Sequence, residues 1–492
     1  MSRRLRVAAS RAAGFYQQYL SGKTRLEHDL LGNREVPYDS YYGVQTLRAI
    51  ENFNITGISI SHHKNLIIAL AQVKKAAAMA NHKLGSLDNT LKDAICKACD
   101  DIISGKYHTH FQVDLIQGGA GTSTNMNANE VIANRALEIM GYEKGQYEHC
   151  HPNNHINMSQ STNDVYPTSL LLTMIYENEN LKAALRELIS SFRKKGEEFK
   201  HILKMGRTQL QDAVPMTLGQ EFEAYAVTLE EEIQRLSDNA KLFHEINMGA
   251  TAIGTGITAE PKYSGYVTHF LREVTGLPLV LASNLVEATQ DTGAFVIYSS
   301  AVKRLAVKLS KISNDLRLLS SGPRAGLNEI NLPAMQPGSS IMPGKVNPVI
   351  PEVVNQIAFK VIGNDLTVTL AAEAGQLQLN VMEPVIAQSI LESIEMLCNG
   401  IMTLKERCID GITANEEKCQ YYVQNSIGLV TALVPLIGYE ACSKVAKEAF
   451  ATNKGVYELV LEHNYLSKEK LDEFLKPENM IQPIHIERHK DY

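Results

Sequence analysis

The sequence predicts a mainly helical protein whose centre is a bundle of long helices. Proline disrupts the interior of a helix, so long stretches without proline favour helices. Five such tracts run between Pro167 and Pro215, Pro215 and Pro261, Pro278 and Pro323, Pro351 and Pro384, and Pro384 and Pro435. Within them apolar residues advance by threes and fours, which is the spacing of one helix face.

The apolar positions define the predicted helices in chain order. They are Leu181, Leu185, Leu188 and Phe192; Leu218, Phe222, Tyr225, Leu229, Ile233 and Leu236; Val302, Leu305, Leu309, Ile312, Leu316 and Leu319; and Ile390, Ile394, Leu397, Ile401 and Leu404. Helices of this length, far above the ~12-residue average, favour a long bundle over a compact helical packing. Their continuous apolar stripes also allow helices of other subunits to pack alongside.

Composition excludes several classes of protein. The chain has 492 residues, of which 44% are hydrophobic, and this is ordinary globular composition. Seven cysteines without a regular framework indicate a reducing compartment and no disulfide network. The apolar stretch Leu429–Ile437 is well short of the ~20 residues that cross a bilayer. We therefore expect a soluble protein with no membrane partner.

The amino terminus differs in charge from the rest of the chain. Residues 1–26 hold five arginines and one lysine, and the first acidic residue is Glu27. Residues 27–492 therefore carry −12 of charge against a net −6 for the whole chain, which argues against nucleic acid as a partner. A basic, amphipathic and acid-free start is typical of a mitochondrial transit peptide, predicted here over residues 1–25. The alternative is a basic tail on a cytoplasmic enzyme.

Changes in composition along the chain predict three domains. We expect an N-terminal mixed domain over residues 26–163, a central long-helix bundle over 164–414, and a small C-terminal domain over 415–492. Segments rich in asparagine and glycine interrupt the bundle, and loops of this kind often carry chemistry.

The segment Gly338–Pro348 combines flexible glycines and rigid prolines with two hydroxyls, one ammonium and one amide. This combination is typical of a mobile lid that carries polar groups to a substrate. A plain surface loop is the alternative. It is disfavoured because Ile341 and Met342 would then be exposed to solvent.

Three further segments place polar groups at turns or helix starts. Gly118–Glu130 brings glycines and then hydroxyls and amides to the start of a helix, where anions bind, although simple capping is the alternative. Ser159–Asp164 precedes a helix that we expect to hold Pro167 in its first turn. Gly206–Gln211 is a polar turn. Each of the last two is weak evidence alone.

Together the four segments resemble the aspartase/fumarase superfamily of lyases, from about Arg25 almost to the carboxy terminus. Within it the likeness is closest to the aspartate ammonia-lyases. The segments that carry this likeness are Asp29–Gly32, Glu35–Pro37, Gly121–Ser123, Met205–Gln209 and Pro351–Gln356. Class II fumarases usually have glutamine where this chain has Ser123 and histidine where it has Gln209.

The resemblance implies a three-domain subunit whose long helices form the core of a homotetramer, with each active site shared by three subunits. It implies a small dicarboxylate substrate and reversible conversion of L-aspartate to fumarate and ammonia. No organic cofactor is implied, while activation by a divalent metal stays open. By resemblance Ser339 matches the general base, and Lys345 and Asn347 match residues that hold the α-carboxylate, with Thr208 and Gln209 nearby. The residues that match the surroundings of the β-carboxylate and amino group are Thr122, Ser161, Thr162, Asn163 and Ser340.

These residue types suit the implied elimination. Removing the Cβ proton places a second negative charge on the neighbouring carboxylate as an enediolate, and neutral donors aimed there stabilise it. A serine base needs activation, which backbone donors or Lys345 could supply when the lid closes. Gln209 favours loss of an amine, because an ammonium leaves already protonated whereas a hydroxyl needs an acid such as histidine.

Other readings stay open at this point. A class II fumarase is the enzymatic alternative, and a catalytically silent structural homologue is the alternative of another class. Cys96 and Cys99 are spaced like half of a zinc site, but without a second pair they are better explained as packing residues. His151–Asn154 is similar to a fumarase segment that lines a secondary dicarboxylate pocket, with asparagine in place of the usual aspartate.

Overall fold

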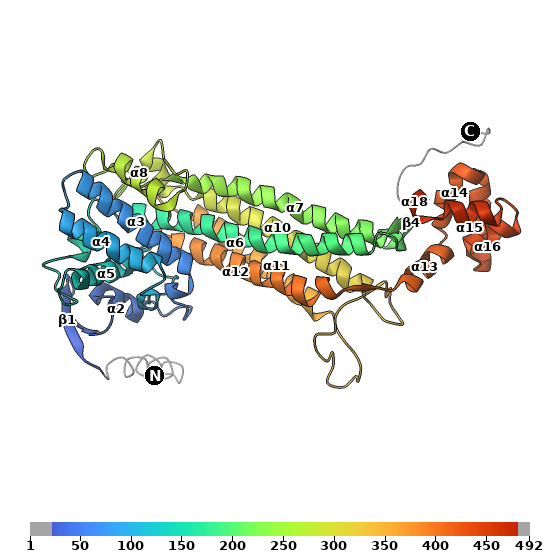
Figure 1. Ribbon diagram of the computed structural model, residues 1–492, viewed down its shortest axis with the longest axis horizontal. Helices are drawn as coiled ribbons and strands as arrows, with labels where there is room; N and C mark the ends of the chain where they lie inside the picture. The colour runs from blue at the N-terminus through green and yellow to red at the C-terminus, as the bar shows by residue number, and fades with distance from the viewer. Residues whose placement is uncertain (1–21, 481–492) are drawn as a thin grey trace. The chain divides into compact units, whose positions relative to one another are not determined.

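The computed structural model describes residues 22–480 and is mainly helical, as predicted (Figure 1). The basic segment interpreted as a transit peptide lies almost wholly outside the described residues. Five long helices correspond to the five proline-free tracts. They are α6 (Thr162–Glu198), α7 (Leu218–Ala240), α10 (Gly293–Leu319), α11 (Val349–Glu373) and α12 (Glu383–Arg407).

The chain divides into two compact units, and each long helix contributes residues to both. Unit 1 comprises residues 1–180, 236–302 and 361–394, and unit 2 comprises residues 181–235, 303–360 and 395–492. The predicted boundaries at 163 and 414 follow sequence composition instead, so the three-domain division stays a prediction.

Unit 1 contains the N-terminal elements and four short ones from the middle of the chain. The N-terminal elements are β1 (Thr24–Asp29), β2 (Gly32–Pro37), α2 (Val44–Asn52), α3 (Lys64–Lys83), α4 (Asn89–Ile103) and α5 (Thr122–Ile139), and the others are β5 (Glu245–Ile246), α8 (Tyr263–Thr275), β6 (Val280–Leu281) and α9 (Leu285–Gln290). Strands β1 and β2 form an antiparallel hairpin, and α3 packs against α4, α5 and α8. Between the long helices of this unit, the Ser299 hydroxyl of α10 donates to Asp365 of α11 over 2.8 Å.

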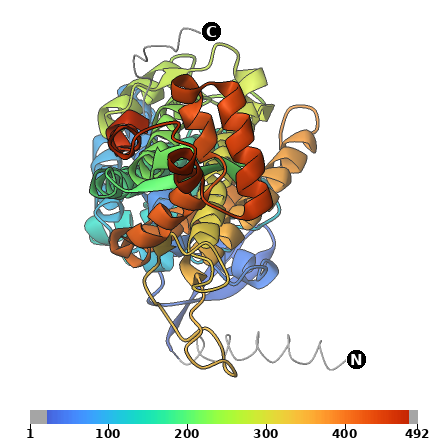
Figure 2. The same ribbon diagram turned by 90° about the vertical axis from the view of Figure 1, so that its right-hand side faces the viewer.

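Unit 2 contains the antiparallel hairpin β3 (Leu203–Thr208) and β4 (Gln211–Thr217), and the strand pair β7 (Ile330–Asn331) and β8 (Thr413–Ala414). Its C-terminal helices are α13 (Glu416–Asn425), α14 (Leu429–Ile437), α15 (Tyr439–Thr452), α16 (Val456–Glu462), α17 (Lys468–Phe474) and α18 (Pro477–Met480). These helices, which face the viewer in Figure 2, gather around their own apolar cluster. Between the long helices, the Phe192 ring of α6 lies 6.1 Å from the Phe222 ring of α7.

Within residues 22–480, one helical stretch is long and apolar enough to cross a membrane, and it spans Glu383–Gly411. Within its most apolar window, 56% of the residues are buried inside the protein. It is α12 of the bundle, and a buried core helix has the same composition as a membrane span.

Candidate active site

The start of α5 confirms the predicted helix after the glycine-rich segment. Gly121 immediately precedes the helix with φ of +90°, which favours glycine, and a Cβ there would lie 2.3 Å from the Tyr166 ring. The next residue, Thr122, is exposed, and its hydroxyl donates to the Gly119 carbonyl over 2.7 Å. The amide of Thr122 also donates to the Gly119 carbonyl, and that of Thr124 donates to the Gln117 side chain, so the turn before the helix and Gln117 cap this helix start.

The start of α6 is closed by a capping box. The Ser161 hydroxyl accepts the amide of Asn163 at 3.2 Å, and the carboxylate of Asp164 accepts the amide of Ser161 at 3.0 Å. Asp164 also accepts the amide of Thr251, and burial raises the pKa of its carboxyl to about 6. Ser161, Thr162 and Asn163 are half-buried at this terminus.

Pro167 lies in the second turn of α6, so the prediction that it lies in the first turn was wrong. The helix begins at Thr162, which makes Pro167 its sixth residue. Proline has no amide to donate to the carbonyl four residues earlier, that of Asn163. The side-chain amide of Asn247 donates to this carbonyl over 3.0 Å instead. A side chain 80 residues away thus makes this proline tolerable inside the helix.

A buried network joins the starts of α5 and α6, and the sequence analysis did not find it. The Lys74 ammonium of α3 donates to the side-chain oxygens of Asn125, Asn157 and Gln160 at 2.7, 3.0 and 2.9 Å. The Asn125 amide in turn lies 3.3 Å from the Thr162 hydroxyl. The one sequence signal was a lysine inside the apolar helix 64–83.

Thr208 and Gln209 lie at the tip of the β3–β4 hairpin, and both are exposed. The two-residue turn is made by Gln209 and Leu210, with φ of +55° and +61°. Such turns favour asparagine and glycine, and each other residue with positive φ costs about 1–3 kcal/mol, so the surroundings must hold this turn. One support is Arg207, whose guanidinium lies 2.7 Å from the Glu329 carboxylate.

Glu329 has no exposed surface and also lies 3.1 Å from the Lys204 ammonium, which in turn lies 2.6 Å from Glu221. It immediately precedes β7, which leads into the lid. A buried carboxylate between two cations of β3 therefore anchors the hairpin that carries Thr208.

The predicted lid forms an irregular loop between β7 and α11 that extends away from the helices of unit 2 (Figure 1). The Ser339 hydroxyl oxygen accepts two backbone amides, of Ile341 at 3.2 Å and of Met342 at 3.0 Å. The Asn347 side chain donates to the Gly338 carbonyl over 2.8 Å, which closes the loop at its base. Ser340 and Lys345 are exposed.

The expectation that Ile341 and Met342 avoid solvent was wrong for the single chain. Their exposed fractions are 83% and 47%. The loop is fixed at its base, and in the described part of the chain no element covers its tip.

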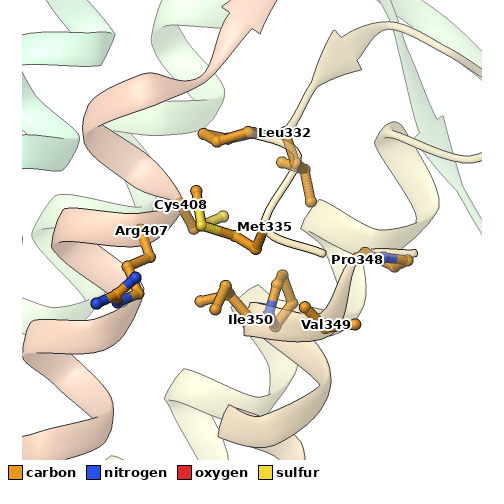
Figure 3. A pocket seen from close by; sticks show the side chains of 9 residues that line it. Leu332, Met335, Pro348, Val349, Ile350, Arg407 and Cys408 are labelled. Atoms are coloured by element: carbon orange, nitrogen blue, oxygen red, sulfur yellow. The ribbon is translucent and has the colours of Figure 1, made fainter. Parts of the chain in front are cut away.

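Both ends of the loop line one small pocket, whose side chains are mostly apolar (Figure 3). Leu332, Pro333 and Met335 come from its first end, Pro348–Pro351 from its second, and Arg407 and Cys408 from the end of α12. Figure 3 shows the Arg407 guanidinium directed away from the cavity. Without polar groups converging on it, this cavity suits packing of the loop base and does not suit a dicarboxylate.

The candidate residues thus form two sets. Thr122, Ser161, Thr162 and Asn163 lie in unit 1, where hydrogen bonds through Asn125 join the starts of α5 and α6. Thr208, Gln209, Ser339, Ser340, Lys345 and Asn347 lie in unit 2. Between the hairpin tip and the loop, the described residues show no hydrogen bond or ion pair. That these residues share one site stays a prediction.

Metal ligands are not gathered in the part of the chain that the structure describes, because residues 22–480 contain no cluster of three histidine, cysteine or acidic side chains. Burial raises the pKa of the Cys96 thiol to about 11 and that of Cys99 well above its usual value. The ring of His151 accepts the amides of Asn153 and Asn154, so it caps its own turn.

Known proteins similar to this chain match nearly all of it. The lyase family matches residues 32–363, and the family described as fumarase C C-terminus matches residues 429–482. An aspartate ammonia-lyase of Helicobacter pylori is 59% identical over 95% of this chain and 100% of its own length. The chain belongs to the aspartase/fumarase superfamily of lyases.

Further relatives agree with this assignment. An aspartate ammonia-lyase of Escherichia coli K12 is 56% identical over 95% of this chain and 98% of its own. Among solved structures, a fumarate lyase:delta crystallin from Brucella melitensis bound to cobalt matches with a TM-score of 0.91 and 55% identity, covering 94% of this chain and all of that one. A class II fumarase from Schistosoma mansoni matches with a TM-score of 0.86 and 36% identity, with the same coverage. The predicted superfamily fold is confirmed, and the protein is a lyase.

The predicted mitochondrial location was wrong. The aspartate ammonia-lyases that match this chain come from bacteria, which have no mitochondria. A basic, amphipathic amino terminus is typical of transit peptides, but short arginine-rich segments also occur for other reasons, so composition alone misled the interpretation.

Proposed function

We propose that this protein is a carbon–nitrogen lyase that reversibly converts L-aspartate into fumarate and ammonia by anti elimination. The observation that carries the proposal is the 59% identity to an aspartate ammonia-lyase over its full length. The class II fumarase is more distant at 36% identity. Gln209 at the hairpin tip adds chemical support, because amine loss needs no acid at that position.

Ser339 is the proposed general base. As an alkoxide it takes the Cβ proton, and the C–H electron pair is delocalised onto the neighbouring β-carboxylate as the enediolate. That pair then forms the Cα=Cβ bond while the C–N pair leaves with ammonia. A serine alkoxide needs stabilisation, and the two amides of Ile341 and Met342 already point at its oxygen. Closure of the lid would exclude water and strengthen both hydrogen bonds.

The enediolate intermediate is proposed to bind at the start of α6. The Ser161 and Thr162 hydroxyls each accept a hydrogen bond from the protein, so each keeps its own hydrogen for a substrate oxygen. Thr122, Asn163 and Ser340 complete the surroundings of the β-carboxylate and the amino group. Lys345 and Asn347 hold the α-carboxylate with Thr208 nearby, Gln209 lies in the substrate-binding set, and no organic cofactor takes part.

A homotetramer with active sites shared by three subunits is part of the proposal. Exposed apolar residues follow one stripe of α11, namely Phe359, Ile362, Leu366 and Leu370. A soluble protein rarely exposes such a stripe, because covering it stabilises the assembly. Cover by a second subunit would also account for the exposed Ile341 and Met342.

The proposal is tested by following fumarate absorbance with purified protein, L-aspartate and L-malate being offered in parallel. Fumarate from aspartate alone supports it. Fumarate from malate alone would establish the class II fumarase instead. No fumarate from either substrate, with an intact tetramer, would favour a silent structural homologue.

The role of Ser339 has its own test. Ser339→Ala should abolish elimination while the oligomer persists, because the lost hydroxyl accepts its two hydrogen bonds from amides of its own loop. A fully active Ser339→Ala variant would remove Ser339 from the mechanism. Lys345→Ala should mainly raise KM, and an unchanged KM would contradict its contact with the carboxylate.

A further inference from the structure

Lys74 is an unusual side chain because its ammonium is completely buried and its three hydrogen-bond acceptors are all neutral amide oxygens. Most buried lysines pair with a carboxylate. Asn125, Asn157 and Gln160 belong to α5 and to the segment before α6, so one cation holds together the two chain segments that carry the unit 1 candidate residues.

The ammonium determines the orientation of these amides. Lysine donates three hydrogen bonds and accepts none, so each amide must turn its oxygen toward Lys74. The Asn125 nitrogen then donates to the Asn157 side-chain oxygen over 3.1 Å and to the Thr162 hydroxyl oxygen over 3.3 Å. Because that oxygen accepts, the Thr162 hydroxyl keeps its own hydrogen for a second acceptor such as a substrate oxygen.

Other titratable groups around Lys74 are few and do not replace these amides. Asp164 of α6 faces it and favours its charge, as does Cys99 of α4, while Tyr263 of α8 faces Asp164. Both carboxylate oxygens of Asp164 are occupied by backbone amides, of Ser161 on one side and Thr251 on the other. The Lys74 ammonium therefore acts on Thr162 through two successive hydrogen bonds, from Lys74 to the Asn125 oxygen and from the Asn125 nitrogen to the Thr162 hydroxyl.

We infer that Lys74 is a positioning residue for the carboxylate-binding hydroxyl of Thr162, which it orients through Asn125. The inference rests on the proposed function, in which a negative charge develops on the carboxylate bound there. A cation behind a hydrogen-bonded chain strengthens every donor along it, and the gain is greatest when the substrate oxygen carries most charge.

Titration of Lys74 should then be visible in the rate. Burial lowers the pKa of its ammonium to about 7. When pH rises through this value, Lys74 loses its charge and one of its three hydrogens. Its two remaining hydrogens must then serve three acceptors, so the hydrogen bond that orients the Asn125 side chain weakens. The inference predicts that kcat/KM falls on the alkaline side of this value in the wild type.

The test compares Lys74→Met with Lys75→Met in the full-length oligomer. Lys75 is the next residue of the same helix, but its ammonium faces outward and pairs with Asp100 over 2.6 Å. We expect Lys74→Met to lower kcat/KM about 10- to 100-fold, less than the ~10²- to 10³-fold typical of losing a donor outright, and to abolish the alkaline decrease. Lys75→Met should keep the wild-type pH profile. A correctly assembled Lys74→Met variant with the wild-type rate and pH profile would overturn the inference.

Asn125→Leu keeps the test decisive if Lys74→Met does not fold. Leucine has the same number and branching of side-chain heavy atoms as asparagine, and it leaves Lys74 with Asn157 and Gln160. It removes the hydrogen bond to Thr162. The same loss of kcat/KM is expected, and an unchanged rate in folded Asn125→Leu would refute the link.

Binding of succinate, a dicarboxylate that cannot eliminate ammonia, separates the inference from the proposed function. The wild type should bind succinate in calorimetry more tightly than Lys74→Met. If the wild type binds succinate in this way but does not deaminate aspartate, the proposed function fails and the positioning role stands. Equal affinities in wild type and Lys74→Met would overturn the positioning role whatever the activity.

Discussion

Replacing Gly121 with alanine should destabilise the protein much more than replacing Gly141, although the two glycines lie at opposite ends of the same helix. Gly121 precedes α5 with φ of +90°, and Gly141 follows it with φ of +88°. Alanine is therefore equally strained at both positions as far as the backbone is concerned. The difference is the space around the new methyl group.

The structure allows the two contributions to be separated. A left-handed conformation costs alanine about 1–2 kcal/mol at either position. At Gly121 the methyl would lie 2.3 Å from the buried Tyr166 ring, whereas at Gly141 no atom lies within 4 Å. Overpacking of this kind adds about 1–3 kcal/mol, so Gly121→Ala should cost about 2–5 kcal/mol in total.

Urea unfolding of both variants and the wild type, at one protein concentration, measures the difference. Reduced freedom of the unfolded chain favours both alanine variants equally, so this effect cancels between them. Gly121→Ala should unfold at a clearly lower urea concentration than Gly141→Ala, and its free energy of unfolding should be lower by about 1–3 kcal/mol. Equal midpoints would refute the reasoning, because the overlap of the new methyl group with the Tyr166 ring would then not lower the free energy of unfolding.

Three further predictions concern burial, assembly and pH. Glu329→Gln should lower the free energy of unfolding by about 3–5 kcal/mol, because Arg207 loses its carboxylate partner and the buried Lys204 loses one of its two. Glu221→Gln should cost about 1 kcal/mol or less, and similar urea midpoints for both variants would contradict the role of Glu329. Leu366→Asp should dissociate the oligomer, whereas Phe450→Asp on the exposed side of α15 should not, and light scattering distinguishes them. Burial raises the pKa of the Glu383 carboxyl from 4.5 to about 8, so the stability that its neutral form contributes should be lost as pH rises through that value. Glu383→Gln should therefore flatten the dependence of the urea midpoint on pH between about 5.5 and 8.5. An unaltered slope would assign this dependence to other groups.

The long helices could be predicted because their signal is local. Each helix repeats apolar residues with a period that its own backbone imposes, so α6, α7, α10 and α12 were visible in the positions of leucine and isoleucine. The helix starts at Thr122 and Thr162 were also predictable, because capping depends on residues three or four positions apart. Pro167 was misplaced by one turn, because its tolerance depends on Asn247, which is distant in sequence.

Tertiary structure alone decided which buried polar groups meet. Nothing in the sequence around Lys74 indicates that its ammonium binds the amides of Asn125, Asn157 and Gln160, and nothing around Glu329 indicates Arg207. Periodicity tells which face of a helix is buried, but the partner of a buried charge is whichever group the fold brings within about 3 Å. The sequence by itself therefore determined the helices and the segments that carry candidate chemistry. The hydrogen bond from Asn125 to the Thr162 hydroxyl, and the ion pair of Arg207 with Glu329 that supports the turn beside Thr208, depend on contacts that only the folded chain makes.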